Sequence, residues 1–399
     1  MVKQILHRIL RRRHFWRNAG FDELTELYIS SMLRTFAMSV LLVFLPFYLY
    51  QLGYSFAAIF AFYGFFFAAR ALADILAAYF VASYGPKHSI ALSCLLQIVS
   101  ASMLLSLATY GWPLWVIAVV FGTSASFFFI AYHVEFSKIK HAEHAGKELG
   151  EMQIFEKIAA IAGPLVGGFA GSYLGPHYIF VVACGILLAS LLPLFRTSEP
   201  VQTGQALHFS QLPVHRLRRD FAAYSALGVE NTLCNIWPLY VALFALTGSV
   251  YAQLGILASA SVAVSIGSAY AIGRFIDHRS ARKMLRIAAI ANMGVYGLRP
   301  LASSLLPAFA IGVANEAITT AYRMPFVKGM YAAADDLPGL RIVYIASMEC
   351  VSSIAKSTAW WLLVICALSF TGRPVLLVAF GLAALASLAI MLERFKALK

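Results

Sequence analysis

Charged residues are scarce in this chain of 399 residues, since Asp, Glu, Lys and Arg make up only 12% of it. A soluble domain carries about 25% of these residues. Hydrophobic residues reach 61% and the mean hydropathy is +0.77, which is more apolar surface than a soluble core can absorb. The shortage of charge therefore excludes an ordinary soluble protein and predicts a chain that spans a bilayer.

Cysteine is rare as well, and the residue patterns that build enzyme sites are missing. The five cysteines lack CxxC spacing and fall inside apolar runs: Cys94, Cys184, Cys234, Cys350 and Cys366. In such places cysteine serves as a small apolar packing residue, so we expect neither a disulfide framework nor a metal site. The sequence contains no metal-ligand cluster, phosphate-binding loop or nucleophile motif. We therefore expect a protein that is not an enzyme and has no bound cofactor.

Positive charge dominates the little charge that is present, with 31 Lys and Arg, 18 Asp and Glu, and a formal net charge of +13. A basic excess can indicate nucleic-acid binding, but here the basic residues lie mainly in short segments between apolar runs. That distribution is the topology signal of inner-membrane proteins, whose basic loops stay in the cytoplasm. It predicts a multi-pass protein of a prokaryotic inner (plasma) membrane, with both termini cytoplasmic, a lipid bilayer as its surroundings and no nucleic-acid partner.

Apolar runs long enough to cross a membrane recur along the whole chain. We place twelve, at about 27–50, 56–82, 88–109, 113–137, 151–174, 177–195, 221–246, 252–275, 284–302, 305–328, 342–370 and 373–393. They predict an all-α polytopic membrane protein with twelve transmembrane helices. The predicted parts are a basic cytoplasmic N-terminal segment (1–26), a six-helix bundle (27–195), a cytoplasmic linker (196–220), a second six-helix bundle (221–393) and a cytoplasmic tail (394–399).

The two halves of the chain resemble each other at nearly one offset. Residues 131–138 read AYHVEFSK and residues 321–328 read AYRMPFVK, 190 residues apart (321 − 131). Residues 45–48 read LPFY and residues 237–240 read WPLY, 192 residues apart (237 − 45). Such echoes predict two pseudo-symmetric bundles, and in a membrane protein two like halves indicate a substrate pathway between them.

The loop between the eighth and ninth runs carries the most distinctive motif. It contains Gly273, Asp277 and the basic pair Arg282-Lys283, with small residues where a second Gly would complete the pattern. Together with twelve spans in two halves and a basic central loop, this motif resembles the major facilitator superfamily of secondary transporters, without indicating a subfamily. The resemblance implies two six-helix bundles that rock about a central site.

The corresponding loop of the first half matches this pattern less well. Gly85 and Lys87 are present, but the acidic position of the family motif is Ala82. A carboxylate near a helix end can bind donors of a neighbouring helix and lock the cytoplasmic side. Its absence keeps an alternative open, namely a membrane scaffold, sensor or lipid-handling protein that has kept the fold and lost transport.

Charged and polar residues deep inside the apolar runs are the candidate site for solute or coupling ion, because a charge at mid-bilayer is costly unless it is functional or paired. This set is Arg34, Arg70, Asp74, Glu230, Asn231, Asn315, Glu316 and Lys356. Some members could simply neutralise one another: Arg70 and Asp74 are four residues apart on one helix face, and Lys356 lies two turns from Glu349. The balance of signs favours an anionic or zwitterionic solute.

A second set lies nearer the cytoplasmic ends, where a gate is a better expectation than solute contact. Its members are Gly85, Lys87, Glu135, Glu156, Gly273, Asp277, Arg282, Lys283, Arg323 and Glu349. On the opposite side only Arg299 and Arg373 approach the membrane face. With the family resemblance, these patterns predict a monomeric transporter that moves a small polar solute by alternating access, with Glu230 or Glu316 exchanging a proton.

Overall fold

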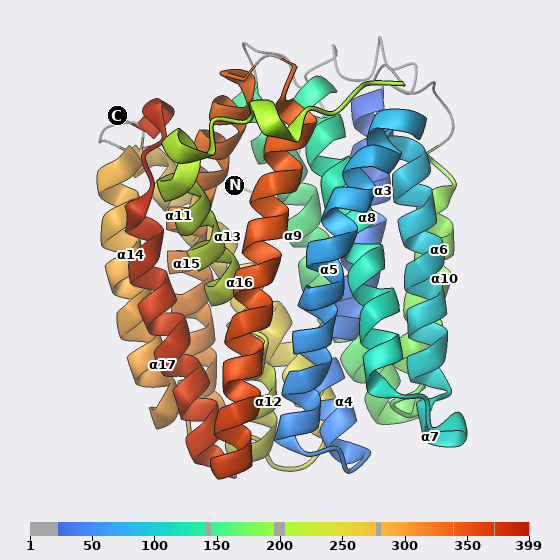
Figure 1. Cartoon of the computed structure of the whole chain (residues 1–399). Helices are drawn as coiled ribbons and strands as arrows, with labels where there is room; N and C mark the ends of the chain where they lie inside the picture. The colour runs from blue at the N-terminus through green and yellow to red at the C-terminus, as the bar shows by residue number, and fades with distance from the viewer. Residues whose placement is uncertain are drawn as a thin grey trace, which may run out of the picture.

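The computed structural model describes residues 23–139, 145–194, 204–276, 281–337, 339–370 and 372–398. Within these ranges the chain is almost entirely helical and contains no strand. The helices stand side by side in a bundle (Figure 1). The helix α5 (Phe56–Tyr84) ends at the top of Figure 1, and α16 (Arg341–Ser369) begins at that same end of the bundle. We call that end of the bundle the upper end, as drawn in Figure 1, and the opposite end the lower end.

Six membrane-length segments come from the first half of the chain. They are α3 (Glu23–Leu42) continued by α4 (Leu45–Gln51), α5, α6 (Pro86–Leu105), α8 (Leu114–Ile139), α9 (Ala145–Phe169) continued by a π-helical turn (Ala170–Leu174), and α10 (Tyr178–Leu191). The short helix α7 (Leu107–Tyr110) lies between α6 and α8 at the lower end (Figure 1). Gly85 ends α5 with φ +91°, a left-handed value that glycine adopts readily, so that α6 can start at the next residue.

Six further segments come from the second half. They are α11 (Val214–Leu233) continued by α12 (Ile236–Phe244), α13 (Val250–Ile276), α14 (Ala281–Leu298), α15 (Leu305–Asp335), α16 and α17 (Arg373–Ala389). Single 3-10 turns lie at Phe209–Gln211, Arg299–Leu301, Ile390–Leu392 and Lys396–Leu398. The predicted all-α fold with twelve transmembrane segments is confirmed, ten of them continuous and two broken.

Length and hydropathy alone identify seven of these segments as able to cross a membrane, within the described ranges. Two more are apolar but shorter, Tyr178–Leu191 and Val250–Val264. The remaining three segments, α11/α12, α14 and α15, have polar residues in their interiors: Glu230, Asn292 and Glu316, respectively. The segments least suited to lipid therefore carry much of the candidate site, as expected of helices that face the inside of a bundle.

Each half starts with a helix that is broken at the same relative place. The first break precedes Pro46, the second residue of α4, and the second break precedes Pro238 in α12. Proline has no N–H to donate to the preceding turn, so a helix tends to break there. The two prolines are 192 residues apart (238 − 46). The matched breaks give a physical meaning to the sequence repeat.

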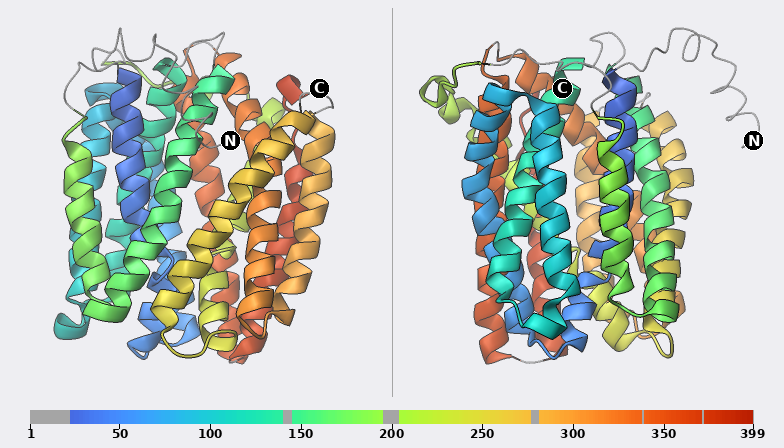
Figure 2. Two further views of the ribbon diagram at one scale, coloured as in Figure 1. Left: turned by 180° about the vertical axis from the view of Figure 1, so that it is seen from behind. Right: turned by 90° about the vertical axis from the view of Figure 1, so that its right-hand side faces the viewer.

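The two halves meet along two pairs of helices. At the front α5 packs on α16, where the Ser357 hydroxyl donates to the Gly64 carbonyl at 3.0 Å. At the back α9 packs on α13, and a Cβ added to Gly168 would lie 3.1 Å from the Gly255 Cα. Figure 2 shows α9 and α13 crossing near the lower end and diverging toward the upper end. Small residues thus bring the halves close together at this crossing.

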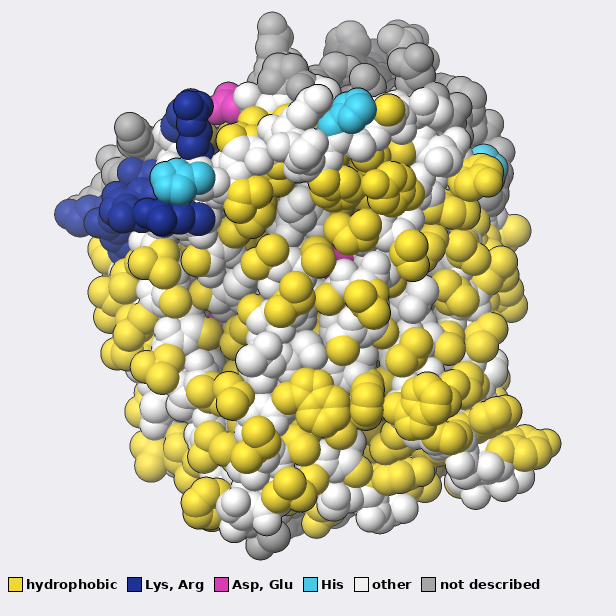
Figure 3. All heavy atoms as spheres, in the orientation of Figure 1, with side chains coloured by type: hydrophobic (Ala, Val, Ile, Leu, Met, Phe, Trp, Pro, Cys, Tyr) yellow, Lys and Arg dark blue, Asp and Glu magenta, His cyan; other side chains and the backbone are white. Residues whose placement is uncertain are grey.

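Aromatic side chains dominate the contact between halves at the lower end. The Tyr251 ring lies 5.3 Å from the Phe47 ring, and its hydroxyl donates to Gln51 Oε1 at 2.6 Å. Across the other helix pair, Tyr63 stacks on Trp360 with ring centroids 4.5 Å apart. The face of the bundle drawn in Figure 3 is largely hydrophobic, as a lipid-facing surface requires.

Candidate functional site

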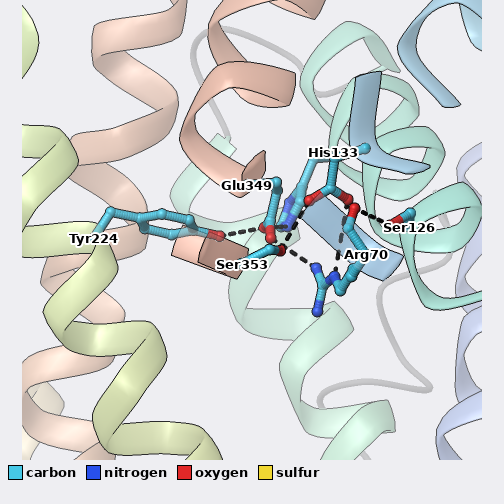
Figure 4. Close-up of polar contacts among 7 residues, drawn as sticks. Arg70, Ser126, His133, Tyr224, Glu349 and Ser353 are labelled. Carbon is cyan, nitrogen blue, oxygen red and sulfur yellow. Dashed lines mark hydrogen bonds and ion pairs between the residues drawn. The ribbon is translucent and has the colours of Figure 1, made fainter. Parts of the chain in front are cut away.

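A buried ion pair joins the two halves above the aromatic contacts. Arg70 of α5 donates from Nη2 to Glu349 Oε2 of α16 at 2.7 Å, and the two residues are 6% and 3% exposed. The other carboxylate oxygen, Oε1, accepts a short hydrogen bond from the Tyr224 hydroxyl of α11 (Figure 4). A buried pair is costly to desolvate and is tolerated when hydrogen bonds satisfy its remaining atoms. Glu349 meets this condition with partners from both halves.

His133 of α8 connects the same carboxylate to a second contact between halves. Its Nε2 lies 3.6 Å from Glu349 Oε1, and its Nδ1 lies 2.7 Å from the hydroxyl of Tyr331 in α15. Arg70 also lies over the Phe129 ring of α8 at 4.6 Å. Three elements of this cluster, α8, α15 and α16, therefore move relative to one another only if these polar contacts change.

Asp74 belongs to the same cluster, but it is the weaker partner of Arg70. The distance from Arg70 Nε to Asp74 Oδ1 is 3.9 Å, whereas Ser353 donates to Asp74 Oδ2 at 2.9 Å. Ser126 donates to the Arg70 carbonyl at 3.0 Å (Figure 4). The Arg70–Asp74 pair considered from the sequence is thus present, but at 3.9 Å it is a long contact. The closer partner of Arg70 is Glu349, which comes from the other half of the chain.

A second polar cluster lies entirely within the second half and holds Glu230. Its carboxylate accepts from the Tyr296 hydroxyl at 2.7 Å and from the Asn292 amide at 3.0 Å, both on α14. The Asn292 amide also donates to the Tyr322 hydroxyl of α15 at 3.2 Å. Glu230 is 2% exposed. The carboxylate is therefore well supplied with neutral donors and needs no cation in contact with it.

Arg299 lies next to this cluster and is completely buried, whereas the sequence placed it only near a membrane face. Its Nη2 donates to Asn315 Oδ1 at 2.8 Å and to Cys234 Sγ at 3.4 Å. Its guanidinium lies 4.0 Å from the Tyr296 ring and 5.1 Å from the Trp237 ring. Aromatic faces stabilise a cation when carboxylates are absent. Asn315, predicted as a solute residue, therefore contacts a protein cation.

Besides Arg299, two further buried cations form no ion pair with a carboxylate in the described part of the chain. Arg34 of α3 is 4% exposed, lies 4.0 Å from the Phe128 ring and donates to Cys94 Sγ at 3.7 Å. Lys356 of α16 is 7% exposed and lies 5.4 Å from the Phe67 ring. Buried cations are normally paired. These two positions are therefore candidate sites for an anion.

Glu316 and Asn231 differ from the rest of the predicted central set because they are partly accessible. Glu316 of α15 is of intermediate burial, and Asn231 of α11 is exposed. The Glu316 carboxylate makes no hydrogen bond or ion pair to any residue whose side chain is described. Nearby, Lys157 of α9 donates to Thr320 of α15 at 3.4 Å, a further contact between the halves, and Arg323 of α15 is exposed.

The predicted gate residues do not form one cluster. Glu349 belongs to the central ion pair described above. Glu156 accepts from the Tyr132 hydroxyl at 2.8 Å, within the first half. Glu135 and Lys87 are almost completely buried, at 0% and 1% exposure.

The motif of the second half has a role within that half. Arg282 donates from Nε to Glu393 Oε1 at 2.8 Å, which ties the start of α14 to the segment after α17. Lys283 is exposed, and Gly273 lies in the last turn of α13. Asp277 lies outside the described residues. The expected contact of the Asp277 carboxylate with a neighbouring helix therefore stays a prediction.

Sequence reasoning missed the neutral members of both clusters. The most important are Tyr224, Ser353, Asn292 and Tyr296. The sequence also placed the cation Arg299 only near a membrane face, whereas it is completely buried. Tyrosine and serine are too common in membrane helices to stand out by type. A signal was available for Asn292 alone, an amide in the middle of an apolar run.

Comparisons with known proteins agree with this architecture. A family model described as Major Facilitator Superfamily matches residues 27–348. The solved structure of the nucleoside transporter NupG is similar, with a TM-score of 0.66 and 14% identity over 93% of this chain and 98% of NupG. A variant of the E. coli fucose:proton symporter FucP has a TM-score of 0.63 and 15% identity over 92% of this chain and 96% of FucP. No curated protein sequence matches. At these identities the solved structures show the fold alone.

Proposed function

Because this chain belongs to the major facilitator superfamily, we propose that it is a secondary active transporter, which moves a small anionic or zwitterionic solute across the membrane by alternating access. The observation that carries this proposal is the Arg70–Glu349 pair between the halves, 2.7 Å long and almost fully buried. Well-packed apolar residues would often serve stability at least as well at such a place. A charge pair between two moving bodies can instead distinguish one conformation from another.

The contacts between halves are suited to a rocking motion. At the lower end they are aromatic and close, and at the back α9 and α13 diverge above the Gly168–Gly255 crossing (Figure 2). Higher up, the halves are joined by polar contacts such as that between His133 and Tyr331. If the upper contacts broke and water replaced them while the lower contacts stayed in place, the protein would be open at the upper end. That is one of the two states that alternating access requires.

Proton coupling is assigned first to Glu316. Its carboxylate is of intermediate burial and has no hydrogen bond among the residues described. Glu230 is 2% exposed and already accepts two hydrogen bonds, from Tyr296 and Asn292. A carboxyl that exchanges protons needs access to water in at least one state, and Glu316 meets this need better.

The upper end is assigned to the cytoplasm of a prokaryotic cell, with the protein acting as a monomer in the inner membrane. Lys and Arg side chains gather at the upper left of Figure 3. Exposed basic residues at this end include Arg216, Arg218, Arg219, Lys283 and Arg286. Basic loops stay on the cytoplasmic side during insertion.

Reconstitution into proteoliposomes tests the proposal. Organic anions, amino acids, nucleosides and sugars are first screened by thermal shift, and uptake of every stabilising compound is then measured with and without a pH gradient. We expect the Glu316→Gln variant to lose the dependence of uptake on the pH gradient. The control is Glu393→Gln, which removes a buried carboxylate whose partner, Arg282, lies in the same half.

Unchanged pH dependence in Glu316→Gln would remove its coupling role. If the wild-type protein takes up none of the stabilising compounds, the scaffold or sensor alternative is favoured. Ala82 in the first-half loop motivates that alternative.

A further inference from the structure

A glycine of α11 creates a small notch against α16. A Cβ added to Gly228 would lie 2.3 Å from the Ser352 hydroxyl oxygen, 2.3 Å from Lys356 Cε and 3.2 Å from Lys356 Nζ. No other residue type fits there without displacing these side chains. The missing side chain lets the ammonium and the hydroxyl lie together against the α11 backbone.

Polar atoms at this notch lack partners within the described part of the chain. The Ser352 hydroxyl is fully buried and makes no hydrogen bond. The same holds for the hydroxyl of Ser225, one turn before Gly228 in α11 and 9% exposed. Among the described residues, Lys356 has no hydrogen-bond or ion-pair partner. Buried polar groups are nearly always satisfied, so the unpaired Ser352 hydroxyl beside the Lys356 ammonium indicates a missing partner.

The chemistry of that partner follows from the groups present. An ammonium and a serine hydroxyl can both donate, and no carboxylate of the described residues forms an ion pair with Lys356. Two carboxylates of the central cluster, Asp74 and Glu349, are engaged by Ser353 and Arg70 at 2.9 and 2.7 Å. An acceptor with negative charge would satisfy both donors by charge-assisted hydrogen bonds.

The position of Lys356 distinguishes it from the other buried cations. Arg70 is held by Glu349, and Arg34 lies inside the first half against Phe128. Arg299 lies inside the second half, where it donates to Asn315 at 2.8 Å. The Lys356 ammonium faces Phe67 of α5, so its surroundings come from both halves. A site at this boundary becomes accessible when the halves move relative to each other.

We propose that Lys356 and Ser352, supported by Ser225, form the anion-binding part of the solute site, with Gly228 as its floor. The ligand class is a small molecule that carries a carboxylate or a phosphate group. The assignment deepens the transporter proposal and rests on it for the passage of the ligand, although binding itself can be tested without transport.

The test measures binding of three probes to the full-length protein in nanodiscs: succinate, inorganic phosphate and the neutral nucleoside uridine. We expect the wild-type protein to bind one of the two anions and not to bind uridine. Lys356→Gln should weaken anion binding about 10- to 100-fold, the effect of losing a charge-assisted hydrogen bond. Gly228→Ala should weaken it as well, since its Cβ displaces both donors. The control Lys396→Gln removes an exposed lysine with a side chain 84% accessible.

Ser352→Ala provides a second test that keeps the charge, in case Lys356→Gln fails to fold. Absence of binding by both anions would overturn the site, and so would equal affinity in the wild type and in the folded variants. Anion binding that depends on Lys356 without uptake in proteoliposomes would support the site and refute the transporter. Uptake of uridine that is unaffected by Lys356→Gln would support the transporter and overturn the site.

Discussion

Substitution Glu349→Gln tests whether the central ion pair holds the halves together. The carboxylate contacts Arg70 at 2.7 Å, the Tyr224 hydroxyl, and His133 at 3.6 Å. Removing one member of a buried pair costs about 3–5 kcal/mol, because the other charge is left without a partner. Glutamine keeps one acceptor oxygen, and Asp74 remains 3.9 Å from Arg70, so we expect about 3 kcal/mol.

The loss falls on a contact that exists only while α5 and α16 are together. A state in which the pair is already broken loses little from the substitution. The equilibrium between the two states should therefore shift by about 100-fold toward separation of the upper ends, at 1.4 kcal/mol for each tenfold change.

Distances between spin labels can detect this shift. Labels are placed at Tyr84 and Asp336, which are exposed at the upper ends of α5 and α15, in a background without the five native cysteines. Glu349→Gln should add a population at longer distance. Glu393→Gln is the matched control, because its 2.8 Å pair with Arg282 lies within the second half. The reasoning fails if the distances do not change in Glu349→Gln, or if both variants change them equally.

Two further predictions concern stability in detergent, measured by thermal or SDS-induced unfolding. Gly255→Ala places a Cβ 2.3 Å from the Pro164 carbonyl oxygen and should destabilise the α9–α13 contact by about 1–3 kcal/mol, whereas Gly294→Ala, with open space around its Cβ, should be neutral or stabilising by up to ~1 kcal/mol. Arg299→Ala should cost about 3–5 kcal/mol, because it leaves a cavity and an unsatisfied amide oxygen. Its control is the exposed Arg286→Ala, which removes no hydrogen bond to the described residues and should cost ~1 kcal/mol or less. Equal effects within either pair would contradict the structure.

Several features of this protein could be predicted from the sequence because they depend on local properties. Mean hydropathy and run length reflect how each segment partitions into a bilayer, so the all-α membrane fold and its twelve spans were predicted correctly. The sequence repeat predicted two like halves, and the structure adds a feature that was not predicted, the matched helix breaks before Pro46 and Pro238. A proline disrupts the hydrogen bonds of its own helix, wherever that helix packs.

The choice of partner for each buried charge was decided by tertiary structure. Residues 70 and 349 are 279 positions apart, and their pairing depends on how α5 and α16 are rotated and placed in depth. The sequence assigned Arg70 to the solute and Glu349 to the gate, yet the two side chains form one contact. The notch at Gly228 likewise exists only because Lys356 and Ser352 of another helix lie against it.

The sequence by itself therefore determined which segments span the membrane and which charged residues they contain. It could not determine which charges neutralise one another and which remain available to a ligand. The free-energy cost of placing a charged group in lipid depends on the residue type itself, so it can be read from the sequence. The contact that offsets this cost comes from a helix far away in the chain. Only the packing of the two halves decides whether Lys356 forms an ion pair with a carboxylate of the protein or is left without one.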